Sequence, residues 1–153
     1  MIVWREEMSI GVVAIDDDHK ALIDIINEFE DSKTRLKAEV SAKKLFTYTQ
    51  SHFRREEELQ DAFRYPHRHD QKHDHGLIIK DLRGIIKSAF VDKTLSDDGL
   101  IASLSKLMHD WIIGHVLTHD MKMKHFFQIT DPSEYNFLPP SILKQSLQQS
   151  VGN

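Results

Sequence analysis

Histidine and carboxylate side chains are the groups best suited to chemistry in this chain, which has ten histidines and no cysteine among its 153 residues. Disulfides, zinc knuckles and iron–sulfur clusters are therefore excluded, and any metal site must use nitrogen and oxygen ligands. The densest group of histidines lies in the stretch YPHRHDQKHDHG, residues 65–76, which contains four of them. A histidine in this stretch can take part in a buried metal site only if it lies on the inner face of its helix.

Apolar spacing indicates which of these histidines point inward, because each helical residue turns by about 100°. His75 continues the apolar stripe that follows it in the chain, whereas His69 and His73 fall on the opposite face. In the preceding helix, His52 and Glu56 share the inner face. An imidazole and a carboxylate four residues apart suit joint attachment to a metal centre, and a buried ion pair is the simpler alternative.

The first and last helical runs each add an inward histidine. His19 begins the apolar stripe of the first run, and His115 lies within that of the last, with Asp120 at its margin. Burying so many polar groups is costly unless they are paired or bound to metal. Imidazoles and bridging carboxylates in a bundle core indicate a binuclear non-haem iron site, since zinc would need only about four ligands. A metal-free bundle, with its histidines satisfied by one another and by water, is the alternative.

Four helical runs must position these side chains. They begin at Asp17, near Val40, near residue 67 and after a polar break around residues 92–98, and the last one extends to about Phe127. Because no strand pattern competes, the predicted fold class is all-α, an antiparallel up-down four-helix bundle with an extended N-terminal leader and a short C-terminal tail. The predicted domain covers residues 1–130, and the tail covers residues 131–153.

Charge and hydropathy restrict the possible partners. A net charge of −4 gives no reason to expect nucleic acid. No apolar run approaches the roughly 18 residues that a membrane span requires. The N-terminus lacks the basic region and apolar run of a signal peptide, so a cytoplasmic domain is expected.

The motifs, in their order and spacing, resemble those of the hemerythrin family, specifically its single-domain bacterial type. The resemblance spans about residues 4–127 and is carried by Trp4, Ser9-Ile10-Gly11, Ile15-Asp16-Asp17-Asp18-His19-Lys20, His52-Phe53-Arg54-Arg55-Glu56-Glu57, Tyr65-Pro66, and Trp111-Ile112-Ile113-Gly114-His115 followed by Asp120. It implies reversible O2 binding without enzymatic turnover, used for oxygen storage, delivery or sensing. The alternative is a di-iron enzyme, such as a peroxidase, a nitric-oxide scavenger or an O2-reducing oxidase.

The resemblance also implies a cofactor of two iron ions joined by an oxo or hydroxo bridge and by two carboxylates. Carried over by position, the metal ligands include His19, His52, Glu56, His75, His115 and Asp120. One iron would take the first two histidines and keep an open position for O2, and the other would take three histidines. Phe53, Trp111 and Ile112 could wall the O2 pocket, although ordinary core packing predicts the same residues there.

One ligand position departs from the family pattern. Six residues after the tyrosine the family has a histidine, and this chain has Gln71. The glutamine could ligate through its amide oxygen, or water could take the place. A third candidate is His119, one helical turn beyond His115 and at the height of the missing ligand if the two helices run antiparallel.

Overall fold

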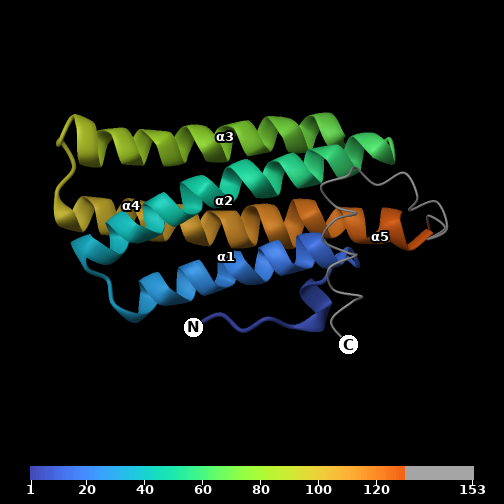
Figure 1. Ribbon diagram of the computed structural model, residues 1–153, viewed down its shortest axis with the longest axis horizontal. Helices are drawn as coiled ribbons and strands as arrows, with labels where there is room; N and C mark the ends of the chain where they lie inside the picture. Colours follow the sequence, from blue (N-terminus) through green and yellow to red (C-terminus); the bar gives the residue numbers. More distant parts are fainter. Residues whose placement is uncertain (130–153) are drawn as a thin grey trace, which may run out of the picture.

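The computed structural model describes residues 1–129, which form a bundle of antiparallel helices (Figure 1). The elements are η1 (Glu6–Met8), α1 (Val13–Asp31), α2 (Arg35–Ala62), α3 (Arg68–Ile86), η2 (Lys87–Val91), α4 (Asp97–Asp110), η3 (Trp111–Asp120) and α5 (Met121–Ile129). The prediction of an all-α four-helix bundle is confirmed, and residues 1–129 contain no strand. The predicted tail, residues 131–153, lies outside the described residues, and the predicted domain boundary stays a prediction.

The fourth arm of the bundle is one continuous rod made of three segments, α4, η3 and α5 (Figure 1). Ser96 caps its start by accepting a hydrogen bond from the backbone N–H of Gly99 at 3.1 Å. Its middle segment, η3, is a π-helix, in which residues about five apart are hydrogen-bonded along the chain. This segment carries His115 and Asp120, so its geometry decides how they face.

Two helices begin earlier than the apolar spacing predicts. The second begins at Arg35, not near residue 40, because the Thr34 side chain accepts the backbone N–H of Lys37 at 3.3 Å. The first begins at Val13, not at Asp17. Its first turn is held by Asp16, whose carboxylate accepts from Ser9 Oγ at 2.6 Å.

The N-terminal leader lies against α1 (Figure 1). The Asn27 side chain exchanges two hydrogen bonds with the backbone of Ile2, each 2.7 Å long. The prediction of an extended leader is confirmed except for the single 3-10 turn of η1. The leader thus covers one face of the first helix.

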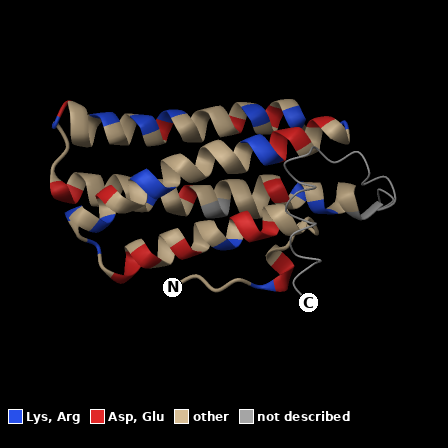
Figure 2. Ribbon diagram, viewed as in Figure 1, with Lys and Arg blue, Asp and Glu red and all other residues tan. Residues whose placement is uncertain are grey.

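Acidic and basic residues are interspersed along the helices (Figure 2). Among residues 1–129, no helix combines the length and the apolar character that crossing a membrane would require. Inside, the apolar residues form two clusters, a large one built around Leu22, Leu45 and Leu104 and a smaller one around Ile15 and Leu59.

Candidate metal centre

A layer of buried polar side chains separates the two apolar clusters. On α1, for example, His19 lies between Ile15 of the small cluster and Leu22 of the large one. Each helical arm contributes to the layer, whose main members are at most 2% exposed: His19, His52, Glu56, Gln60, Gln71, His75, His115 and Asp120. Apolar packing on both sides excludes bulk solvent, so these groups depend on one another or on a bound cation.

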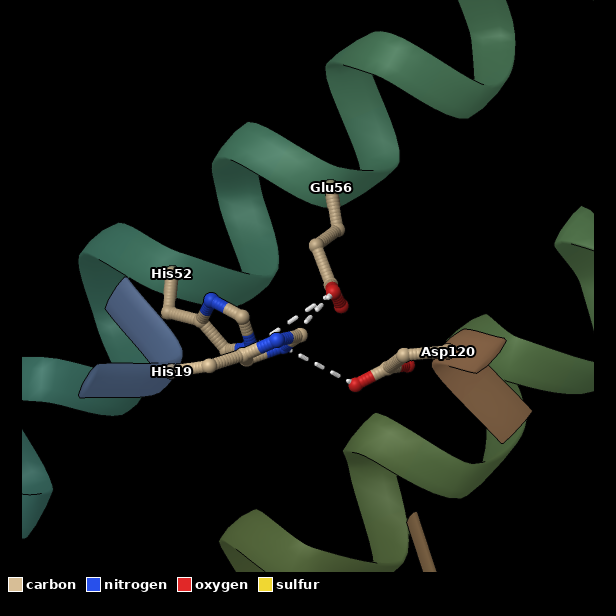
Figure 3. A group of neighbouring side chains, drawn as sticks. All are labelled: His19, His52, Glu56 and Asp120. Carbon is tan, nitrogen blue, oxygen red and sulfur yellow. Dashed lines mark ion pairs between the residues drawn. The ribbon is translucent and has the colours of Figure 1, made fainter. Parts of the chain in front are cut away.

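The layer contains two overlapping groups of possible metal ligands. We define the first subsite as His19 and His52 and the second subsite as His75 and His115; Glu56 and Asp120 belong to both groups. Within each group the candidate ligand atoms lie within 4.8 Å of one another. Figure 3 shows the first group, with side chains from α1, α2 and η3 converging on one point.

Each shared carboxylate presents one oxygen to each subsite. Glu56 Oε1 lies 3.6 Å from His52 Nε2, and Glu56 Oε2 lies 3.1 Å from His75 Nε2. Asp120 Oδ2 lies 3.2 Å from His19 Nε2, and Asp120 Oδ1 lies 3.2 Å from His115 Nε2. Two carboxylates placed in this way can bridge two cations held side by side.

The ligand atoms at the centre of the layer are buried without hydrogen-bond partners. They are the Nε2 atoms of His19, His52, His75 and His115, both carboxylate oxygens of Glu56, and Oδ2 of Asp120. Leaving such an atom unsatisfied costs about 1–3 kcal/mol, and more for a charged group. Imidazole nitrogen with carboxylate oxygen is a donor set that suits iron, so the residues present fit a pair of iron ions.

Outer carboxylates orient three of the four histidines. The Nδ1 atoms of His52, His75 and His115 lie 3.3, 3.1 and 2.7 Å from carboxylate oxygens of Asp18, Glu57 and Asp74 respectively. Because a carboxylate only accepts, each Nδ1 carries the proton and each Nε2 is left free to face inward. Carboxylate–histidine pairs of this kind are typical of metal sites.

Reasoning from the sequence missed these outer partners. The available signal was an acidic residue beside a ligand, since Asp18 precedes His19, Glu57 follows Glu56 and Asp74 precedes His75. The histidine that each acid contacts lies on another helix, which spacing along one helix does not give.

The carboxylates attract positive charge into the layer. Burial lowers the pKa of His19, but the close carboxylates of Asp120 and Glu56 outweigh it and raise that pKa to about 10. Burial raises the pKa of Glu56, yet the neighbouring histidines hold it well below its usual value. The centre is therefore built to hold cations, whether protons or metal ions.

Gln71 occupies the position where the resemblance leads one to expect a histidine. Its side chain is 2% exposed, and its Nε2 donates to Asp120 Oδ1 at 2.6 Å. Its Oε1 accepts from Gln60 Nε2, also at 2.6 Å. Gln60 was not among the predicted site residues, although it lies one turn beyond Glu56 on the same face of α2.

His119 does not reach the buried layer, which corrects its predicted inward position. Its side chain is 34% exposed, and its Nδ1 lies 3.6 Å from Asp74 Oδ2 on the outer side of the bundle. His119 lies in η3, a π-helix in which hydrogen bonds join residues about five apart along the chain. Asp120, five residues after His115, takes the inner place instead. His119, His115 and Asp74 form a separate, partly exposed group of possible ligands.

Aromatic rings wall the layer on one side. Phe53 stacks on His75 with ring centroids 3.9 Å apart and lies 5.4 Å from Trp111. Tyr48, not predicted to take part, stacks on His52 at 5.0 Å. The side chain of Ile112, the third predicted wall residue, lies outside the described part of the chain.

The remaining histidines are exposed on the outer faces of the helices, at positions 67, 69, 73, 109 and 125. His67 lies at the N-terminal cap of α3.

The fold and the site together define a class: four-helix-bundle proteins that hold cations with histidines and shared carboxylates in the core. Residues 10–126 match the family model described as the hemerythrin HHE cation binding domain. The chain belongs to the hemerythrin family, as the motifs predict. It is 25% identical over 123 residues to a bacteriohemerythrin of Stenotrophomonas maltophilia (strain R551-3), covering 78% of this chain and 77% of that protein.

Two other relatives give the same result. The chain is 27% identical over 128 residues to a bacteriohemerythrin of Clostridium acetobutylicum, covering 78% of this chain and 96% of that protein. It is 29% identical over 123 residues to myohemerythrin-1 of Phascolopsis gouldii, covering 80% of this chain and 91% of that protein. The similarity therefore extends over most of each protein.

Proposed function

We propose that the chain binds O2 reversibly at a pair of non-haem iron ions. The observation that carries this proposal is the double bridge, in which Glu56 and Asp120 each turn one oxygen to each pair of histidines. Membership of the hemerythrin family supports it. Two ferrous ions held there would each supply one electron to O2.

The proposed ligands are the six residues of the two groups. His19 and His52 would hold the first iron, His75 and His115 would hold the second, and Glu56 and Asp120 would be shared by both. His119 is left out of this set because it is partly exposed and contacts Asp74.

The protein residues around the centre keep it dry and oriented. Trp111 is 1% exposed and Phe53 is 3% exposed. These two rings exclude water from the side of the layer that they cover. Exclusion of water and protons hinders the loss of bound oxygen and the irreversible oxidation of the metal. The Asp18, Glu57 and Asp74 carboxylates lie beside the Nδ1 atoms of their histidines and so direct each Nε2 inward.

Iron content and the visible spectrum test the proposal. We expect two irons per chain and a charge-transfer band that appears when the anaerobically reduced protein meets O2 and disappears when O2 is removed. A protein that retains one iron or none after reconstitution would contradict the proposed pair. Two irons with no oxygen-dependent band would contradict O2 binding.

A di-iron enzyme, such as a peroxidase, a nitric-oxide scavenger or an O2-reducing oxidase, is the second candidate. The observation favouring it is Gln71, which stands at a position of the second subsite where the family pattern has an imidazole. An oxygen-dependent band that bleaches irreversibly within a few turnovers, with hydrogen peroxide consumed or produced, would favour the enzyme over the carrier.

A further inference from the structure

We infer that Gln71 is a positioning residue for Asp120 and not a metal ligand, so that the second subsite keeps an open side for a small exogenous ligand, as the first does. The inference rests on the proposed pair of irons and adds to it a second place where O2 or a small anion binds.

Both ends of the Gln71 amide are already used. The Nε2 group donates to Asp120 Oδ1 at 2.6 Å, and Oε1 accepts from Gln60 Nε2 at 2.6 Å. All three side chains are at most 2% exposed, so solvent does not compete for these bonds. Gln60 Nε2 also lies 3.3 Å from Met123 Sδ, which packs against it from α5.

The chemistry of the chain of bonds fixes which way each amide points, even though amide nitrogen and oxygen have almost the same shape. The carboxylate of Asp120 only accepts, so it requires the NH2 group of Gln71. The oxygen of Gln71 then faces Gln60, which must donate. Reversing Gln71 would press its oxygen against a carboxylate oxygen at 2.6 Å with no proton between them.

The atom with which a glutamine binds metal is its amide oxygen, and here that oxygen faces Gln60 and not the carboxylate shared by the subsites. His119 does not replace the missing imidazole either, since it is 34% exposed and lies on the far side of His115, against Asp74. Among residues 1–129, the second group thus comprises two histidines and two shared carboxylates, the same donors as the first.

Four protein donors leave an iron ion short of the six ligands of an octahedral site, and a single bridging oxygen would not complete the set. Each subsite therefore has room for a ligand from solution. The two differ at a shared carboxylate: Asp120 Oδ1, which faces the second subsite, already accepts the Gln71 N–H. That bond draws electron density from the oxygen, which weakens its donation to the second cation.

Azide titration of the iron-loaded, oxidised protein tests the inference, with calorimetry giving the stoichiometry and visible absorption identifying the iron–azide band. We expect two azides per chain in the unsubstituted protein. In Gln71→His, which supplies an imidazole at that position, we expect one azide per chain and a second metal-binding step about 10–100-fold tighter, measured with Co²⁺ as the probe. His119→Gln is the matched control and should keep two azides and both metal-binding steps.

Iron analysis before the titration separates the two possible failures. Fewer than two irons per chain would overturn the proposed function, and this inference with it. Two irons with only one azide would leave the proposed function standing and overturn the inference alone. Loss of iron in His119→Gln, or a rise from one azide in the unsubstituted protein to two in that variant, would also overturn it, since His119 would then be the missing ligand. The titration of the unsubstituted protein decides the matter even if Gln71→His fails to fold.

Discussion

The two subsites share their carboxylates but differ in how their histidines are held from outside. In the second subsite, both His75 and His115 donate to an outer carboxylate, at 3.1 and 2.7 Å. In the first, His52 has such a partner at 3.3 Å, while Nδ1 of His19 has none among the described residues. A carboxylate behind an imidazole makes the imidazole a stronger metal donor. The second subsite, which lacks a third histidine, therefore has the two histidines that are better supported by outer carboxylates.

The outer carboxylates also differ in their surroundings. Asp18, behind the first subsite, is 14% exposed and forms an ion pair with Arg55. Glu57 and Asp74, behind the second, are 26% and 29% exposed. A recess of about 270 Å³ reaches Asp74 and His115 from the surface. The outer carboxylate of the first subsite is thus neutralised by Arg55. Behind the second, Lys72 lies 3.4 Å from Glu57 and neutralises it, whereas the ion pairs of Asp74 are with His115 and His119, so more negative charge remains there.

Removing a shared carboxylate should empty both subsites together, so that no difference between them remains. For Glu56→Ala we expect iron affinity to fall by more than about 100-fold at both positions, because the loss of an outer partner alone costs up to that much. Glu39→Ala, near the start of the same helix, is the control for losing one carboxylate from α2. Iron analysis of both variants makes the test, and a Glu56→Ala protein that keeps one iron would show that Glu56 serves a single subsite.

Removing one histidine should empty one subsite and leave the other. We expect His19→Ala and His115→Ala each to retain about one iron per chain. In each variant the subsite that was not changed keeps both of its histidines and the two shared carboxylates. Mössbauer spectra of the two variants should then show single iron sites that differ from each other. Complete loss of iron in both would mean that the two positions fill only together.

Most of the inner layer could be predicted from the sequence because it depends on helical periodicity. A turn of about 100° per residue placed His19, His52, Glu56 and His75 on inner faces, and all four are at most 1% exposed. The rule failed within η3, where π-helical bonding moved Asp120 fully inside, and no residue pattern announced that change.

Contacts between helices could not be predicted in the same way. The bond from Gln71 to Asp120 joins residues 49 positions apart, and its geometry depends on how far α3 is displaced along η3. A periodic pattern gives the face of each helix but not that displacement. The start of α2 was missed for a local reason, because Thr34 was not recognised as a cap.

Weakening the outer partners should sharpen the difference between the subsites. For Asp74→Asn we expect the affinity for the second cation to fall by about 10–100-fold, because His115 loses a carboxylate at 2.7 Å. For Asp18→Asn we expect a smaller loss at the first, since its bond to His52 is longer and its charge is already shared with Arg55. Stepwise Co²⁺ titration measures the metal affinity of each subsite. Equal losses of affinity in the two variants would mean that the outer carboxylates support their subsites equally.

The smallest expected effect is a pH dependence of the iron-free protein that originates at His19. Its pKa in the folded chain is about 10, above its usual value of 6.5, so its contribution to stability is complete below pH 6.5 and is lost as the pH rises toward 10. We expect the free energy of unfolding to fall by at least about 1 kcal/mol between pH 6.5 and pH 9. Urea unfolding of iron-free protein across this range measures it, and His19→Gln, which cannot take up the proton, is the control. Iron-loaded protein should not show this fall, because the metal then supplies the positive charge that the proton supplied. An iron-free protein equally stable at both pH values would mean that Glu56 and Asp120 do not keep His19 protonated.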